Sequence, residues 1–178
     1  MVWKLNSIPS KPTGSPPVLM IVLRFAHVFF GALWVGMMAF QMFFLGPALE
    51  EAGPAAGSVM AGLMKRRIPV IMPLIALIAL VSGMWLFMRL SGDNMAVVWG
   101  SRMGQAFGTG GAIALFAFLI GVVVMRPLMM KSMQLMQSGD PAHKPEIQRL
   151  QARASTLGKL VSYMLLVTLG LMAVARYL

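Results

Sequence analysis

The chain has 178 residues, of which 58% are hydrophobic and only 11% are charged. A soluble domain carries about 25% charged residues and somewhat under half apolar ones, so this composition excludes an ordinary soluble domain and indicates a membrane protein. Since a membrane-spanning helix needs about 20 residues, the length allows about four or five crossings and no second domain. The chain has no cysteine, which excludes disulfides, thiolate metal sites, iron–sulfur clusters and covalently bound c-type haem.

The charge balance is strongly basic, with 15 Lys and Arg against five Asp and Glu and a net charge of +10. In a soluble protein this excess would point to nucleic acid. Here the basic residues lie at the ends of apolar runs, which favours contact with anionic headgroups and a role in setting topology. We therefore predict the lipid bilayer, and not nucleic acid, as a partner.

Residues 1–17 contain four prolines and no apolar run. A secretory signal peptide needs an apolar stretch directly after a basic start, so this segment does not fit one. We predict an extended, proline- and serine-rich arm, followed by a single transmembrane domain over residues 18–178.

Four apolar runs follow the arm and predict an all-α, antiparallel four-helix bundle in the membrane. The predicted spans are residues 18–45, 68–88, 106–125 and 157–175. The first span should end before Gly46 and Pro47, which form a stop signal. The second span has Pro69 and Pro73 near its start, where proline is best tolerated.

Three of these helices are expected to continue beyond the bilayer on one side by roughly 15 Å. The reason is that residues keep recurring at helical spacings of three or four outside the spans. These residues are Ala56, Met60, Leu63 and Arg67 before the second span; Met125, Met129, Met133 and Met136 after the third; and Ile147, Leu150, Ala154 and Leu157 before the fourth.

The distribution of basic residues predicts the orientation. The loops 46–67 and 126–159 hold nine Lys and Arg, and the opposite side holds six. This excess, and above all the cluster Lys65, Arg66 and Arg67, places those two loops in the cytoplasm. The extended helix ends are then cytoplasmic, and both chain termini are periplasmic.

His27 is the only histidine in a predicted span, and a polar residue inside the membrane is a functional candidate. It shares a helix face with Arg24, Gly31 and Trp34. One interpretation is a b-type haem or copper ligand, with Arg24 pairing a haem propionate. The other is an interhelical hydrogen bond with Arg24 reaching to headgroups. A second imidazole is not present in any span, because His143 lies in a loop.

Methionine is unusually frequent, with 19 residues. Met125, Met129, Met133 and Met136 form a stripe at helical spacing. Thioether sulfur is a soft ligand that suits Cu(I), so the stripe is a candidate metal path. Methionine is also a flexible packing residue, and a packing seam is the alternative interpretation.

Small residues mark candidate packing surfaces. Gly104, Gly108 and Gly111 lie along one face at the start of the third span, and Gly31 precedes Trp34 in the first. Small faces allow helices to approach closely. We expect these positions to pack within the bundle or against a partner.

No span contains a carboxylate, and the chain has no Ser/His/Asp set or HExxH helix. We therefore predict that the chain is not an enzyme and binds no required cofactor. The predicted function is that of a non-catalytic accessory subunit of a larger respiratory or photosynthetic membrane complex, with other membrane-protein subunits as partners.

The stretch RFAHVFFGALWVGMMAFQMFFLGPAL, residues 24–49, has a histidine, then Trp-Val-Gly seven residues later, then an apolar run closed by Gly-Pro-Ala-Leu. It resembles the first helix of the copper-resistance D-type (CopD-like) membrane proteins and related bacterial four-helix proteins. The similarity extends more loosely through residues 66–87, 124–130 and 173–178. It implies a bacterial inner-membrane four-helix protein and, as the alternative function, handling of copper or b-type haem with His27 at the matching position.

Overall fold

The structure is a computed structural model, and it is described here for residues 17–92 and 94–178. These residues are almost entirely helical, and no strand occurs among them. Four helical units are long and apolar enough to cross a membrane: Val18–Ala52, Ile68–Ser91, Arg102–Gln137 and Pro141–Tyr177. The chain is therefore an all-α, multi-pass membrane protein. The predicted arm lies outside the described residues except for Pro17, where the first helix begins.

The elements follow one another closely along the chain. They are α1 (Pro17–Phe40), η1 (Gln41–Leu45), α2 (Gly46–Ala52), η2 (Gly53–Ala55), α3 (Ala56–Lys65), α4 (Ile68–Ser91), α5 (Met95–Gly100), α6 (Arg102–Leu119), η3 (Ile120–Met125), α7 (Arg126–Gln137), η4 (Pro141–His143), α8 (Lys144–Val174) and η5 (Ala175–Tyr177). The elements η1 and η3 are π-helical turns, and η2, η4 and η5 are 3₁₀ turns.

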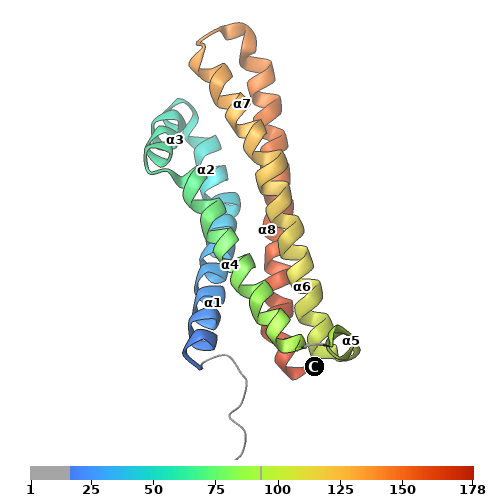
Figure 1. Cartoon of the computed structure of the whole chain (residues 1–178). Helices are drawn as coiled ribbons and strands as arrows, with labels where there is room; N and C mark the ends of the chain where they lie inside the picture. Colours follow the sequence, from blue (N-terminus) through green and yellow to red (C-terminus); the bar gives the residue numbers. More distant parts are fainter. Residues whose placement is uncertain (1–16, 93) are drawn as a thin grey trace, which may run out of the picture.

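The long helices form two antiparallel hairpins, α1 with α4 and α6–α7 with α8 (Figure 1). The hairpins join where α8 packs on α1 and α6 packs on α4. The start of α1, the short helix α5 and the C-terminus lie at one end, here named the α5 end. The tip between α7 and α8 lies at the other, here named the α7–α8 end. The four-helix bundle predicted from the sequence is thus confirmed.

The expected stop at Gly46 and Pro47 is wrong, because the first helix continues through them to Ala52. Proline removes one backbone donor and crowds the preceding turn. The wide turn η1 comes just before Pro47 and relieves this: the N–H of Gly46 donates to the carbonyl of Gln41, five residues back. The turn η3 precedes Pro127 in the same way, so both hairpins carry a π-turn followed by proline.

The extension predicted for the second span is also wrong, because α3 and α4 are separate helices. Arg67 adopts a left-handed backbone conformation with φ 56°, which ends the helical path between them. The third and fourth spans continue as helix past their predicted ends, as expected, since α7 runs to Gln137 and α8 begins at Lys144. Lys131 and Glu146 connect these two extensions through an ion pair of 2.6 Å.

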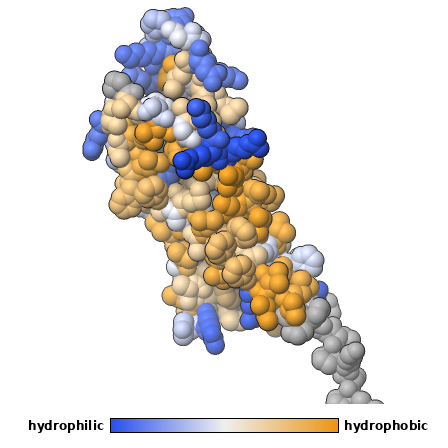
Figure 2. All heavy atoms as spheres, turned by 90° about the vertical axis from the view of Figure 1, so that its left-hand side faces the viewer, coloured by the Kyte–Doolittle hydropathy of each residue, from blue (hydrophilic) through white to orange (hydrophobic). Residues whose placement is uncertain are grey.

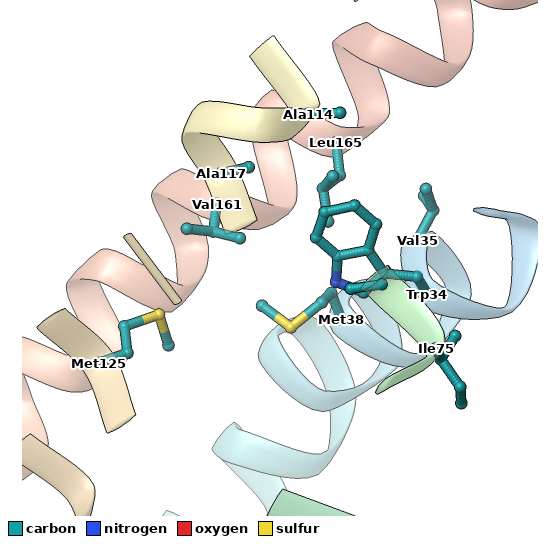
Figure 3. Close-up of a cluster of buried hydrophobic side chains, with 10 residues drawn as sticks. Trp34, Val35, Met38, Ile75, Ala114, Ala117, Met125, Val161 and Leu165 are labelled. Atoms are coloured by element: carbon teal, nitrogen blue, oxygen red, sulfur yellow. The ribbon is translucent and has the colours of Figure 1, made fainter. Parts of the chain in front are cut away.

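The core lies where α1, α4, η3, α6 and α8 meet. Its members are Trp34, Val35, Met38, Ile75, Ala76, Ala114, Ala117, Met125, Val161 and Leu165. Figure 3 shows the Trp34 indole extending from α1 toward Leu165 on α8. Its ring also meets Phe118 edge-on, with the ring centres 6.3 Å apart. Trp34 is therefore a packing residue that links the two hairpins, as the sequence predicts.

Most apolar side chains point outward. In the most apolar window of each span, only 11–28% of the residues are buried inside the chain. Figure 2 shows the consequence, a broad hydrophobic band between hydrophilic groups at the two ends of the molecule. An exposed apolar band of this extent indicates that the protein lies in lipid.

Candidate functional site

The half-buried side chain of His27 connects α1 to α4. Its Nδ1 lies 2.9 Å from the carbonyl oxygen of Ala79. A carbonyl can only accept, so Nδ1 carries the proton and donates. The same oxygen accepts a bond of 3.1 Å from the Ser82 hydroxyl. The Nε2 of His27 has no hydrogen-bond partner among the described residues and keeps its lone pair in the neutral ring.

A glycine on the facing helix provides the space for this ring. A Cβ atom at Gly83 would lie 2.6 Å from Cε1 and 2.7 Å from Nδ1 of His27. Any larger residue would displace the imidazole. The sequence interpretation included His27 but missed Ala79, Ser82 and Gly83, although the Ser-Gly pair is a visible interruption of an apolar run.

Arg24 lies one turn before His27 and is exposed at the α5 end of α1. It forms no ion pair with a described residue. Its side chain is long enough to reach headgroups or an acidic group of a bound ligand. His143 is in η4 at the opposite, α7–α8 end, 3.9 Å from Asp140, so the structure does not bring the two histidines together.

The methionine stripe is divided between core and surface. Met125 is buried in the core, Met129 and Met133 are half-buried, and Met136 is exposed. The sulfur of Met136 accepts a bond of 3.5 Å from the amide of Gln151 on α8. The stripe therefore follows the contact between α7 and α8, which is the geometry of a packing seam.

The predicted glycine face of the third span makes its contacts with α5. A Cβ at Gly104 would meet the backbone of Val98, and one at Gly108 would lie 2.6 Å from the Trp99 ring. A Cβ at Gly111 would have nothing within 4 Å. The close approach to α8 is made by Gly110, whose carbonyl accepts a bond of 3.3 Å from the buried Thr168 hydroxyl.

Another buried hydroxyl, that of Ser162, connects the two hairpins. Ser162 on α8 donates to the carbonyl of Met38 on α1 over 3.2 Å. Together with the His27–Ala79 and Thr168–Gly110 bonds, it gives each of three helix pairs one side-chain bond to a backbone carbonyl. Interhelical bonds of this kind hold membrane bundles together. The sequence interpretation missed both hydroxyls, although each interrupts an otherwise apolar run.

The small residues of the first span lie partly on the outside of the bundle. A Cβ atom at Gly31 would have nothing within 4 Å, and the same holds for the exposed Gly36. Ala32, four residues before Gly36, is also exposed. We name the surface made by Phe25, Phe29, Ala32, Gly36, Phe40 and Phe44 the outer face of α1. A shallow recess at its α5 end is lined by Arg24, Phe25, Val28, Phe29, Ala32 and Leu33.

Stacked aromatic pairs border the small residues of this face. The rings of Phe25 and Phe29 are 5.4 Å apart, and those of Phe40 and Phe44 are 6.2 Å apart. Ala32 and Gly36 lie between the two pairs along the helix. The outer face of α1 therefore has small residues at its centre and an aromatic pair on either side of them along the helix.

A polar cleft of about 390 Å³ opens between α2 and α8 at the α7–α8 end. It is lined by Glu50, Gln148, Gln151, Ala152, Ser155 and Thr156. This lining holds one carboxylate and no imidazole, so it offers no acid–base pair.

Of the site residues predicted from the sequence, His27 offers one imidazole nitrogen and the methionines and glycines of the described chain lie mostly in packing contacts. No group of three or more His, Asp or Glu side chains that could hold a metal ion occurs in residues 17–92 and 94–178. Any ligand of His27 would thus have one imidazole from this chain. Known protein families, curated proteins and solved structures offer no match to the chain.

Proposed function

We propose that this protein is a non-catalytic accessory subunit of a larger bacterial membrane complex, respiratory or photosynthetic, and that it docks through the outer face of α1. The observation that carries the proposal is the pair Ala32 and Gly36, which is small, exposed and uncovered by the described helices of the chain itself. Small residues four apart let two membrane helices approach to backbone contact.

The surroundings of this pair support a helix as the occupant. Lipid chains already solvate Leu and Phe side chains well. They therefore gain no additional contact where two small residues lie between pairs of aromatic ones. A helix that enters between the stacked pairs Phe25–Phe29 and Phe40–Phe44 gains van der Waals contact with both. The outer face of α1 is thus shaped for a helix of another subunit.

The distribution of acidic residues supports a non-catalytic role. All five, Glu50, Glu51, Asp93, Asp140 and Glu146, lie outside the spans predicted from the sequence, 18–45, 68–88, 106–125 and 157–175. Proton relays and hydrolytic sites in membranes usually need a carboxylate or a second titratable group inside the bundle. The Nδ1 of His27 is bonded to a backbone carbonyl and not to a carboxylate.

The test is co-purification from native membranes in mild detergent, followed by a native gel. We expect the wild-type chain to migrate with other membrane proteins, and Gly36→Leu and Ala32→Leu each to release it. The matched control is Gly170→Leu, because Gly170 is exposed on α8 and also has open space around it. A free monomer or a complex of identical chains in the wild type would contradict the proposal, as would retention of the partner by both α1 variants.

The orientation follows from the basic residues and is part of the proposal: the α7–α8 end is cytoplasmic and both termini are periplasmic. The chain contains no cysteine, so a single introduced cysteine can be labelled without background and shows on which side of the membrane it lies. Ser138→Cys, at the end of α7, should resist a membrane-impermeant thiol reagent in spheroplasts, and Asn94→Cys, before α5, should react. The reverse labelling would overturn the orientation.

A second function, handling of b-type haem or copper as the resemblance to copper-resistance D-type proteins implies, has one observation in its favour. The Nδ1–H of His27 is held by the Ala79 carbonyl at 2.9 Å, which orients the ring and leaves Nε2 as the ligand atom. Arg24 is placed one turn away for an acidic group. An absorption spectrum with a Soret band, or copper in the purified protein, that is lost in His27→Ala would support this function; absence of both from the wild type would exclude it.

A further inference from the structure

Three consecutive basic residues form the turn between α3 and α4. Lys65 ends α3, Arg66 and Arg67 make the connection, and Ile68 begins α4. All three basic side chains are exposed. We name this segment the tribasic turn.

Backbone bonds hold the tribasic turn in place. The N–H of Arg67 donates to the carbonyl of Met64 over 2.9 Å, and the carbonyl of Arg67 accepts from Val70 and Ile71 over 2.9 and 3.0 Å. Arg67 has φ 56° and is the only non-glycine residue with positive φ in the described part of the chain. The left-handed backbone is unfavourable for residues other than glycine, and the bonds on both sides maintain it here. The backbone that carries the three adjacent cations is thus held in one conformation.

Within residues 17–92 and 94–178, no acidic side chain pairs with this cluster. The ion pairs among the described residues are Lys131–Glu146 and His143–Asp140, and neither involves the tribasic turn. Three adjacent exposed cations repel one another, and an anion bound between them removes that repulsion.

The tribasic turn lies at the border of the hydrophobic band. Directly after it, Val70, Ile71 and Leu74 of α4 are exposed apolar side chains. On the side of the molecule that carries α3, a strongly hydrophilic patch stands at the upper edge of the band (Figure 2). A molecule bound here would meet cations with one end and apolar side chains with the other.

We propose that the tribasic turn is a binding site for an anionic phospholipid, whose phosphate lies among Lys65, Arg66 and Arg67 and whose acyl chains lie along Val70, Ile71 and Leu74. The recognised chemistry is a phosphate group, which free phosphate shares, but only a lipid uses the apolar surface below it. This site requires only insertion of the protein in a membrane and does not depend on a partner subunit or on His27.

The test is native mass spectrometry of the purified full chain in detergent, with phosphatidylglycerol as the anionic probe and phosphatidylcholine as the zwitterionic one. A micelle has no sides, so effects of these charges on membrane orientation do not enter. We expect wild-type protein to prefer phosphatidylglycerol by roughly tenfold or more. The triple variant Lys65→Gln, Arg66→Gln, Arg67→Gln should lose that preference, and excess inorganic phosphate should not displace the lipid.

The matched control removes the same charge elsewhere: Lys144→Gln, Arg149→Gln, Arg153→Gln, three exposed residues of α8. It should keep the preference. A second variant, Arg67→Gly, adopts positive φ without strain; it should keep its thermal unfolding temperature and lose affinity by roughly fivefold. Unchanged lipid preference in the triple variant, equal loss in the control, or displacement by phosphate would each overturn the proposal.

Discussion

The Nδ1 of His27 and the carbonyl oxygen of Ala79 lie 2.9 Å apart, although the residues are 52 positions apart in the chain. This bond crosses the contact between α1 and α4, the two helices of the first hairpin. It exists because Gly83 has no side chain to occupy the space of the imidazole. His27 and Gly83 therefore form one unit, and their substitutions should not be independent.

A double-mutant cycle tests this coupling. His27→Ala should lower the free energy of unfolding by about 1–2 kcal/mol through loss of the interhelical bond. Gly83→Ala should lower it by about 1–3 kcal/mol, because the new methyl group displaces the ring. In the double variant the methyl group has room, so the combined loss should fall short of the sum by about 1 kcal/mol or more. Additive losses, measured by denaturant titration in mixed micelles, would show that the two residues act separately.

Two other tight glycines should differ in their response to alanine. At Gly104 the added methyl group meets the backbone of Val98, with the carbonyl carbon at 2.7 Å, and the backbone cannot move without displacing α5. At Gly158 it meets the ends of two flexible side chains, Met42 and Met125, the latter through its Cε at 3.2 Å. We expect Gly104→Ala to cost about 1–3 kcal/mol and Gly158→Ala less than about 1 kcal/mol. Thermal unfolding of both variants measures these losses, with Gly31→Ala as the uncrowded control. A larger loss in Gly158→Ala than in Gly104→Ala would contradict the packing described.

Buried hydroxyls should also differ according to their partners. Ser132 on α7 is 3% exposed, and its oxygen has no hydrogen-bond partner in the described part of the chain. Ser162 is equally buried but donates to Met38. Ser132→Ala removes an unpaired polar group and should be neutral or stabilising by up to about 1 kcal/mol, whereas Ser162→Ala should cost about 1 kcal/mol. A loss of stability in Ser132→Ala as large as that in Ser162→Ala would indicate that Ser132 has a partner of its own.

The ion pair of Lys131 with Glu146 should make the tip between α7 and α8 sensitive to acid. The hydrogen bond from Lys131, followed by the positive charge of the same side chain, lowers the pKa of Glu146 below its ordinary value of 4.5. Because the pKa of Glu146 is lowered in the folded state, its ion pair contributes fully to the stability of the fold above pH 4.5. That contribution is lost as the pH falls from there through the folded-state pKa. Both side chains are exposed, so the effect is small and decreases with salt.

Hydrogen exchange of the α7–α8 tip, followed between neutral and acidic pH at low salt, measures this contribution. Protection of the tip should decrease on acidification in the wild type. Glu146→Gln should show weaker protection at neutral pH and a flatter dependence. Protection that increases as the pH falls, or an unchanged profile in the variant, would contradict the assignment to this pair.

Several features were predictable because they depend on local composition and periodicity. The apolar runs are long enough to span a bilayer and free of acids, so the all-α bundle and its four spans follow from the cost of burying unpaired polar groups in lipid. The periodic apolar positions of α7 and α8 likewise predicted their extension beyond the band. The candidate role of His27 could be recognised for the same local reason, since it is the one histidine in an apolar run.

Other features depended on local backbone conformations that the residue types do not reveal. The stop expected at Pro47 does not occur because the π-turn η1 absorbs the proline, and the continuous helix expected through Arg67 is interrupted by its left-handed backbone. Neither event has a composition signal strong enough to outweigh the usual preferences of proline and arginine.

By itself, the sequence determined that this chain is a helical membrane protein with basic residues at the ends of its spans, because hydrophobicity and charge act residue by residue against lipid and water. Only the tertiary structure decided that His27 meets Ala79 through the space at Gly83, and that Ala32 and Gly36 stay uncovered on the outer face of α1. Which side of a helix faces a neighbour depends on how all four helices rotate to pack together. This rotation is the reason that Gly83 lies against the imidazole of His27, whereas Gly36 is exposed on the outer surface.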